Sequence, residues 1–252
     1  QTVEEINQVL NLIEDMAAVL GLKRGEDFRY RLSLSGPGNK EKYYPDEKAW
    51  NFAEEVLRQV LKERKAPFFE AENEAAFYGP KIDIQMKNFA GKEETAFTVQ
   101  YDFVMPKKFK MTYIDKDGSR QEPIVIHRSS IGAIERVMAF LIEKYAGAFP
   151  VWLSPVQVKV IPITDRQNSY GQEIAKWLEK EAIRVELDDR NETTSAKIRD
   201  AELEKIPYMI IVGDREVKAK NISIRSRREG DLGQMAKEKF LTKIKGDIEN
   251  KS

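Results

Sequence analysis

The spacing of hydrophobic residues changes near residue 153, and this change limits most strongly what the chain can fold into. Before it, apolar and polar residues alternate in segments 81–86, 96–103 and 109–114, a period of two that is typical of antiparallel strands. From residue 156 onward, short apolar runs alternate with helical patterns, and this βαβα order indicates a mainly parallel sheet. The sequence therefore predicts two domains, residues 1–153 and 154–252.

Local signals fix the expected elements of each domain. In the first domain we expect helices at 3–20 and 47–65, the second capped by Asp46, a strand at 28–34, a hairpin turn at 115–118 and a short buried strand at 123–126. In the second domain we expect strands at 156–161, 184–187, 208–212 and 222–225, and helices at 169–182, 196–205 and 237–248.

Composition narrows the function classes. Charged residues make up 33% and hydrophobic residues 41% of the 252, which is an ordinary globular balance. Lys+Arg and Asp+Glu are 42 each, so no overall charge indicates a nucleic acid or a membrane as partner. Without cysteine there is no disulfide and no thiolate nucleophile, and no apolar run has the ~18 residues of a membrane span. The chain begins at Gln1 inside helical periodicity, and we expect it to be a processed or excised piece.

The segment His127–Arg136 joins an expected strand to an expected helix and contains the only histidine. Gly132 lets another backbone or a ligand approach the first turn closely. The guanidinium of Arg136 suits a polyphosphate, because it offers several donors in one plane. Apolar residues at helical spacing form a stripe that continues to Tyr145: Ile131, Ile134, Val137, Met138, Leu141 and Ile142.

A Gly-Pro bend at residues 79–80 leaves Tyr78 and Lys81 at its rim. A hydroxyl and an ammonium there suit a small polar substrate and a phosphate. The alternative interpretation is structural: Tyr78 would cover the edge of a core, and Lys81 would be a solvated surface residue. The bend alone does not separate these two interpretations.

Strand alternation places Thr98, Gln100 and Asp102 on one face. Such a face either lines a binding cleft or is the exposed side of an antiparallel sheet. From this strand alone, the exposed side of a sheet is the favoured interpretation. For the lone histidine, His127, a hydrogen-bonding role is favoured over metal binding, because a zinc site takes three or four side chains. A complete metal site is not expected in this chain.

Basic residues gather in one stretch of the second domain, with Glu216 as the only acid among them. They are either a phosphate track along a sheet edge or solvated surface cations, and charge runs are usually the latter. They are Arg215, Lys218, Lys220, Arg225, Arg227 and Arg228.

Taken together, these segments closely resemble the threonyl-tRNA synthetases, a family of class II aminoacyl-tRNA synthetases. The matching stretches are AFYGPKIDI (76–84), TVQYDF (98–103), VIHRSSIGAIERVMAFLIEKYAGAFPVWLSPVQV (125–158), DDRNETTSAKIRDAELEKIPYMIIVGDREV (188–217) and ISIRSRREGDLG (222–233). They follow the family's order and spacing over nearly the whole chain. The resemblance implies an α+β domain, built on part of the antiparallel class II catalytic sheet, followed by an α/β anticodon-binding domain.

The resemblance also implies roles in the first domain. HRSSIGAIER looks like class II motif 3, in which the catalytic Arg136 would contact the phosphates of ATP. His127 matches the family's third zinc ligand, where zinc grips the amino and hydroxyl groups of threonine. Tyr78 and Gln100 match residues around the threonine pocket, and Lys81 lies nearby.

In the second domain, Asn191, Glu216 and Arg225 match positions that read anticodon bases, with Arg199 close by. These residue types suit the task, because Asn and Glu pair with base edges and Arg pairs with or stacks on splayed bases. Thr193 stands where many relatives carry a lysine in the anticodon site, so the resemblance does not extend to that RNA contact.

The sequence departs from the family in what it lacks. We expect it to begin after motifs 1 and 2, hence without the dimer-forming motif and the motif-2 arginine that holds ATP and the substrate carboxylate. The family's zinc-binding cysteine, its other zinc-binding histidine and its editing domain are missing as well.

The resemblance implies that the intact enzyme is a cytoplasmic homodimer. It would use Zn²⁺, ATP and Mg²⁺ to join threonine to threonine tRNA, away from membranes. We expect the 252-residue chain to lack a complete zinc site and to be inactive by itself. The alternatives are a non-catalytic tRNA- or RNA-binding truncation or paralogue, and a fragment with no independent function. An exposed sheet edge and apolar patch, and hence self-association, are also expected.

Overall fold

The computed structural model describes residues 1–36, 38 and 41–252. The chain divides into two compact units, Gln1–Phe140 and Leu141–Ser252. This division falls inside helix α4 (Ile134–Tyr145), before the domain boundary predicted after residue 153. That boundary stays a prediction.

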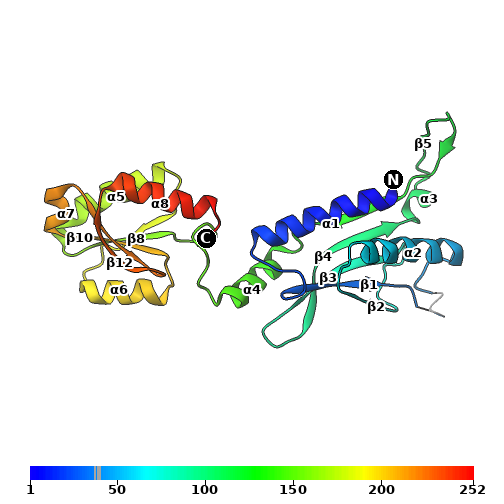
Figure 1. Cartoon of the computed structure of the whole chain (residues 1–252), viewed down its shortest axis with the longest axis horizontal. Coiled ribbons are helices and arrows are strands. Elements are labelled where there is room, and N and C mark those ends of the chain that lie inside the picture. The colour runs from blue at the N-terminus through cyan, green and yellow to red at the C-terminus, as the bar shows by residue number, and fades with distance from the viewer. Residues whose placement is uncertain (37, 39–40) are drawn as a thin grey trace. The chain divides into compact units, whose positions relative to one another are not determined.

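The first unit is built on a five-stranded sheet with the order β2-β1-β3-β4-β7 (Figure 1). Its strands are β1 (Phe28–Ser33), β2 (Phe68–Ala71), β3 (Lys81–Lys87), β4 (Glu93–Asp102) and β7 (Val125–Ser129). Only β1 and β2 pair in parallel; the other three pairings are antiparallel. The predicted antiparallel sheet is therefore confirmed in its main part.

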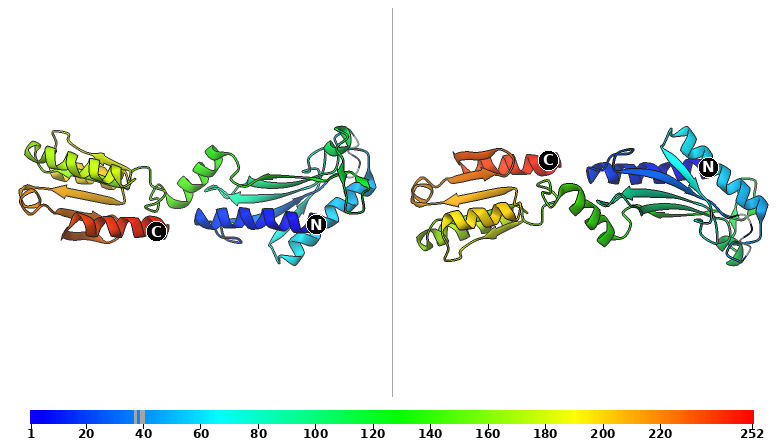
Figure 2. Two further views of the ribbon diagram at one scale, coloured as in Figure 1. Left: turned by 90° about the horizontal axis from the view of Figure 1, so that it is seen from above. Right: turned by 90° about the horizontal axis from the view of Figure 1, so that it is seen from below.

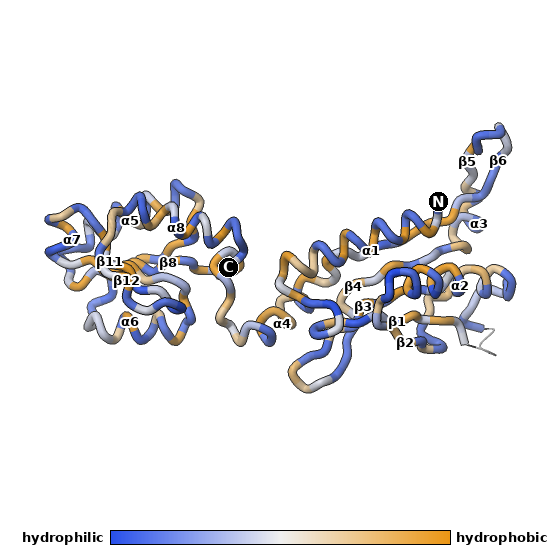
Figure 3. The backbone as a smooth tube through the Cα atoms, in the orientation of Figure 1, coloured by the Kyte–Doolittle hydropathy of each residue, from blue (hydrophilic) through white to orange (hydrophobic). Residues whose placement is uncertain are grey.

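Side-chain alternation gives this sheet one apolar face. Tyr30 and Leu32 of β1, Ile82 and Ile84 of β3 and Val99 of β4 are all completely buried. Helices α1 (Thr2–Val19) and α2 (Glu47–Glu63) cover this face (Figure 2). Along α1, hydrophobic and hydrophilic residues recur at helical spacing (Figure 3), so one stripe of the helix can be buried against the sheet.

Helix α2 begins where the sequence predicted. The carboxylate of Asp46 accepts a hydrogen bond from the backbone N–H of Ala49 at 3.1 Å, which satisfies one donor of the first turn. On the sheet side, Trp50 and Leu57 are buried. On the outer side, Arg58 contacts the carboxylate of Glu70 in β2 and ties the helix to the sheet edge.

The strand predicted at 109–114 is wrong over most of its length. Residues Met105–Lys108 form a short helix, α3, and the chain leaves it through Lys110, whose φ of 51° is left-handed and not extended. Only β5 (Tyr113–Ile114) pairs, with β6 (Arg120–Gln121), around the predicted turn at 115–118. The hairpin is therefore confirmed, but it is short.

The strand expected at 123–126 is also corrected. Strand β7 runs from Val125 to Ser129, so it contains His127. It is only partly buried, because it is the last strand of the sheet and pairs with β4 alone. Edge strands expose side chains that an interior strand would cover.

Helix α4 buries only part of its apolar stripe. Val137, Phe140 and Leu141 are buried, whereas Ile134 and Met138 are exposed over more than half of their surface. The predicted exposed apolar patch is confirmed in this helix. Whether it causes self-association stays a prediction.

The second unit contains a five-stranded mixed sheet with the order β12-β11-β10-β8-β9. Its strands are β8 (Val158–Pro162), β9 (Val185–Leu187), β10 (Tyr208–Val212), β11 (Ile222–Ser226) and β12 (Gly230–Met235). The βαβα pattern correctly predicted that β9, β8 and β10 are parallel. It missed β12, and the antiparallel pairing of β11 with both neighbours makes the sheet mixed.

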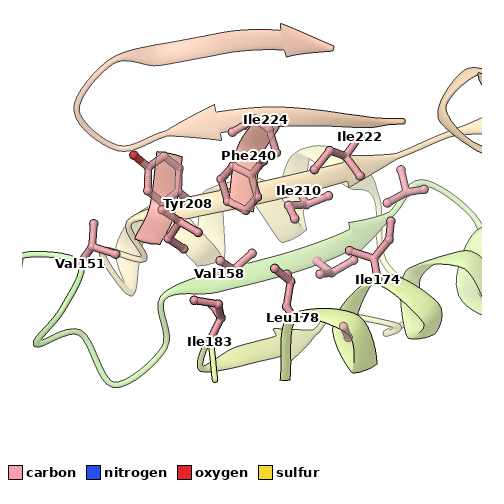
Figure 4. Packing of buried hydrophobic residues seen from close by; sticks show 14 residues of the cluster. Val151, Val158, Ile174, Leu178, Ile183, Tyr208, Ile210, Ile222, Ile224 and Phe240 are labelled. Atoms are coloured by element: carbon pink, nitrogen blue, oxygen red, sulfur yellow. The ribbon is translucent and has the colours of Figure 1, made fainter. Parts of the chain in front are cut away.

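Helices cover both faces of this sheet. Helices α5 (Asn168–Lys180) and α8 (Lys237–Glu249) lie on one face, and α6 (Thr194–Leu203) lies on the other (Figure 1). Figure 4 shows Phe240 of α8 and Leu178 of α5 in the same core as Ile210 and Ile224 of the sheet. The core between the sheet and α6 is smaller and contains Ala201, Ile206 and Met209. A short helix that the sequence did not predict, α7 (Asp214–Ala219), follows β10.

Candidate functional site

The sheet face opposite α1 and α2 is polar, because alternation turns hydrophilic residues to that side. Strand register brings these residues into two rows. The first row crosses β1, β3, β4 and β7 through Ser33, Lys81, Gln100 and His127. The second row crosses the same strands through Arg31, Asp83, Thr98 and Ser129. These two rows of side chains form the polar face of the sheet.

Asp83 is the centre of the polar face. Its buried carboxylate accepts hydrogen bonds from Ser33 Oγ, Thr98 Oγ1 and Arg31 Nη2, each at 2.8 Å. It also lies 3.0 Å from the ammonium of Lys81. Burial alone would raise the pKa of Asp83, but the charge of Lys81 and these hydrogen bonds outweigh it and hold that pKa below its ordinary value. Asp83 therefore remains ionised and fixes both cations.

Four sequence-predicted positions meet at the end of the first row. The hydroxyl of Tyr78 donates a hydrogen bond to the side-chain oxygen of Gln100. The rings of Tyr78 and His127 lie 5.5 Å apart between centroids. Lys81 stands opposite Gln100 in the strand register. Burial and the negative charge of Asp102 raise the pKa of Tyr78, so the hydroxyl remains a hydrogen-bond donor at neutral pH.

The bend before β3 is possible only with glycine. A side-chain carbon on Gly79 would lie 1.7 Å from the carbonyl oxygen of Tyr101, which is far inside contact distance. Close approach of these backbones brings Tyr78 beside β4. The Gly-Pro signal therefore has a structural reason, and that reason places Tyr78 at the polar face.

Arg136 lies apart from this group. Its guanidinium donates to the backbone carbonyl of Thr95, near the opposite end of β4 from Gln100. Gln100 is the fifth residue after Thr95 along the strand, a distance of about 16 Å at the usual rise. Gly132 precedes the helix with φ +75°, and a side-chain carbon there would lie 2.0 Å from the carbonyl oxygen of Ala96. The predicted close approach of another backbone at Gly132 is confirmed.

His127 does not complete a metal site with its neighbours. Its Nε2 lies 2.8 Å from Oδ2 of Asp102, and Oδ1 of Asp102 already accepts the N–H groups of Val104 and Met105. Among residues 1–36, 38 and 41–252, no group of three or more histidine, cysteine, aspartate or glutamate side chains is placed to hold an ion. One imidazole with one occupied carboxylate does not match a zinc coordination set.

In the second unit, Asn191 follows the carboxyl end of β9 and Glu216 that of β10, the two parallel strands that flank β8, and α/β sheets commonly bind ligands at this end. Asn191 is exposed in the loop between β9 and α6. Glu216 is buried instead, and its carboxylate accepts hydrogen bonds from the backbone N–H of Gly213 at 2.9 Å and from the side chain of Gln234. Glu216 thus caps helix α7, a use that its sequence position did not indicate.

Arg225 and Arg199 lie on the side of the sheet that carries α6. Arg225 stands opposite Met209 in the register, and Met209 packs against Ala201 of that helix. Arg199 projects from α6 with 71% of its side chain exposed. Thr193 caps α6 by accepting the N–H of Ala196 at 3.2 Å. A surface formed by the loop after β9, α6 and β11 therefore carries three of the four predicted RNA-reading residues.

The basic residues of 215–228 do not follow one sheet edge. Arg225 is on β11, which is an interior strand. The guanidinium of Arg227 donates to the backbone carbonyls of Lys205, Ala148 and Phe149, so it holds the chain together and does not line a track. The predicted placement of these two residues along one sheet edge is wrong, and a phosphate contact of the run stays a prediction.

Sequence analysis gave no role to Asp83 and Lys197. Both are charged and buried. Asp83 occupies a polar position of the alternating segment 81–86, where the pattern indicates an exposed side chain, so its burial had no signal in the sequence. Lys197 gave no signal either, because its helix shows little amphipathic pattern.

Comparisons with known proteins agree over both units. The model of the "tRNA synthetase class II core domain (G, H, P, S and T)" matches residues 1–145, and that of the "Anticodon binding domain" matches residues 157–247. A threonine–tRNA ligase of Clostridium botulinum (strain Eklund 17B / Type B) is 47% identical over 251 residues, which is 100% of this chain and 39% of the relative. One of Geobacillus kaustophilus is 42% identical over 252 residues, or 38% of its length.

A solved structure shows the same fold. The crystal structure of the RNA-binding domain of threonyl-tRNA synthetase from Cryptosporidium parvum matches with a TM-score of 0.85 at 28% identity, over 98% of this chain and 60% of that one. The chain thus spans about two fifths of the length of the curated relatives that it matches.

Proposed function

The chain belongs to the class II tRNA synthetase core family, and from this premise we propose that it serves threonine–tRNA ligation. The intact protein would activate threonine with ATP and transfer it to threonine tRNA. The observation that carries this proposal is the meeting of Tyr78, Gln100 and His127 on the polar face, with Lys81 across the register. Hydroxyl, amide and ammonium groups at one place suit an amino acid and a phosphate.

Each of these residues has a proposed role in binding threonine and ATP. The neutral hydroxyl of Tyr78 and the amide of Gln100 would bind the polar groups of the amino acid. Lys81 and Arg136 would bind negatively charged groups of ATP, which would arrive with Mg²⁺. Arg136 would act in catalysis by stabilising charge that develops at the phosphates, which requires a fixed donor and no proton transfer.

The zinc ion of the family would need ligands beyond this chain. His127 would supply one of the three ligands, and the sequence contains no other histidine and no cysteine. When bound, zinc would select threonine by holding its amino and hydroxyl groups.

Anticodon recognition is proposed for the second unit. Asn191, Arg199 and Arg225 would reach RNA from the surface around α6, and Glu216 would contribute from the start of α7. The exposed amide of Asn191 and the exposed guanidinium of Arg199 support this role. Because Glu216 is buried, it would touch RNA only at the margin of this surface, or it would act indirectly by holding the backbone at Gly213 in place.

We propose that the 252-residue chain is catalytically silent by itself, because the motif-2 arginine and two zinc ligands of the family lie outside its sequence. The test is threonine-dependent pyrophosphate exchange by the purified chain, with the full-length Clostridium botulinum relative as positive control. Exchange above background would contradict the proposed inactivity but leave the family role intact.

RNA binding is tested on the same chain. Filter binding of a threonine tRNA transcript should weaken steeply with salt, and Arg225→Ala should lose about 1–3 kcal/mol of binding free energy if the guanidinium contacts a base. Lys239→Ala removes an equal charge from the exposed side of α8, on the other face of the sheet, and should have little effect. Absent or salt-independent binding would count against anticodon recognition.

A second candidate is a non-catalytic RNA-binding protein. It is favoured by one observation, the fold match over 98% of this chain to a structure described as an RNA-binding domain. Mass spectrometry of the natural gene product distinguishes the two: the ligase requires a chain well beyond 252 residues.

A cytoplasmic location and a homodimeric intact enzyme belong to the first proposal. None of the described helices has the length and apolarity that a membrane crossing requires.

A further inference from the structure

We infer that Lys197 is a positioning residue for RNA reading, because it fixes the loop that carries Asn191. The inference rests on the proposed anticodon function. Lys197 lies on helix α6 with only 3% of its surface exposed. Its ammonium donates hydrogen bonds to the backbone carbonyls of Asp188 at 3.0 Å and Pro162 at 3.3 Å.

The two carbonyls explain why a buried cation is tolerated here. Pro162 ends β8, and Asp188 directly follows β9, so both carbonyls lie at the carboxyl end of adjacent parallel strands. Each carbonyl therefore lies where its strand ends, and the ammonium of Lys197 contacts both at that point. An isolated buried charge is costly, but an ammonium that satisfies two such acceptors ties both strands and the helix together.

A second set of contacts holds the same loop from its other side. The guanidinium of Arg190 binds both carboxylate oxygens of Asp188, at 2.8 and 2.7 Å. It also lies 3.1 Å from the carboxylate of Asp200, on the same helix as Lys197. Residues 188–190 are therefore fastened to α6 at two points, three residues apart along the helix. We call these contacts the loop bracket.

Asn191 is the first residue after the loop bracket, and it is exposed. A base-reading amide gains specificity when its backbone is already ordered, because the ordering cost is then not taken from the binding free energy. Lys197 itself is too deeply buried to touch RNA. Its effect on recognition must therefore pass through the position of the loop.

The experiment measures discrimination by the whole 252-residue chain. Filter binding compares a threonine tRNA transcript with the same transcript carrying three replaced anticodon bases. We expect Lys197→Met to reduce the ratio of the two affinities about tenfold, with an unchanged slope of log affinity against log salt, because no phosphate contact is removed. General loosening of the domain would lower this ratio as well, so a control variant separates the two effects.

Lys159→Met is the matched control. Lys159 is also a buried lysine under α6, but its partners are Glu186 and Glu204, away from the loop. It should lower thermal stability comparably and leave discrimination unchanged. Equal loss of discrimination in this control would show that general loosening is responsible and would overturn the inference.

Asp200→Asn decides the matter if Lys197→Met does not fold. It opens the loop bracket at a partly exposed position and removes a negative charge, so non-specific RNA binding should stay the same or strengthen while discrimination falls. Unchanged discrimination in the folded variants overturns the inference alone. A wild-type chain that binds both transcripts equally contradicts the anticodon function itself, and the inference with it.

Discussion

The Nε2 atom of His127 lies 2.8 Å from Oδ2 of Asp102, a carboxylate with no exposed surface. The other oxygen of Asp102 accepts the N–H groups of Val104 and Met105, both at 2.9 Å. One side chain thereby joins the end of β4, the turn that follows it and the edge strand β7. Because β7 pairs with β4 alone, this contact is a main constraint on the histidine.

The first prediction concerns this pair. A carboxylate only accepts hydrogen bonds, so Nε2 of His127 should carry the hydrogen. In Asp102→Asn the amide oxygen stays with the two backbone N–H groups, and its NH₂ faces the ring, which should move the hydrogen to Nδ1. Nitrogen NMR of the ring reports this directly, because the chain has one histidine. Identical ring spectra in both proteins would contradict the contact. The free energy of unfolding of Asp102→Asn should be about 1–3 kcal/mol lower than that of wild type.

The second prediction uses the glycine before α4. Gly132→Ala should destabilise the protein by about 2 kcal/mol or more, because the new methyl group would collide with the carbonyl of Ala96 and φ is +75°. Gly246→Ala is the control: it lies in helix α8 with nothing within 4 Å of an added carbon, and should stabilise by about 0.5–1 kcal/mol. Urea unfolding measures both, and equal effects would refute the close approach.

The third prediction is a loss of stability at alkaline pH. Burial, together with its hydrogen bond to Asp247, raises the pKa of Tyr208 to about 12. A folded pKa above the unfolded value of about 10 means that the stabilisation is complete below pH 10 and disappears as the pH rises towards 12. Tyr208→Phe removes the hydrogen bond to Asp247 and should be less stable than wild type at pH 8, and the difference should shrink between pH 10 and 12 as wild type loses stability. A constant difference would disprove the linkage.

The fourth prediction separates two proposed base readers. Glu216→Gln should cost about 1–2 kcal/mol of unfolding free energy, because the carboxylate caps α7 at Gly213 and accepts from Gln234. Asn191→Ala should change stability by less than about 0.5 kcal/mol, since its side chain is exposed. Both variants should weaken tRNA binding. If Glu216→Gln were neutral in thermal unfolding, the cap would not hold as described.

Several local features followed from the sequence because short-range physics decides them. The cap of α2 by Asp46 depends on four consecutive residues. The turn at 115–118 needs only its own composition, and period-two alternation correctly placed Thr98 and Gln100 on the polar face. The motif around His127 and Arg136 pointed to the family, which the matches over 1–145 and 157–247 support.

Other features depended on neighbours that the sequence does not name. The segment 109–114 has strand-like alternation, but a helical turn precedes it and only two of its residues find a partner. Whether β7 is buried depends on its place at the end of the strand order. Periodicity describes a segment's own preference, whereas pairing requires a second segment at the right distance.

The sequence by itself determined the family, the two kinds of sheet and the residue types of the polar face. Only the tertiary structure decided which charges are buried and what they hold: Asp83 beneath Lys81, Asp102 behind His127 and Lys197 behind the loop of Asn191. The physical reason is that a buried charge is stable only with partners from distant strands and helices. Register and packing bring those partners together, and no local pattern records them.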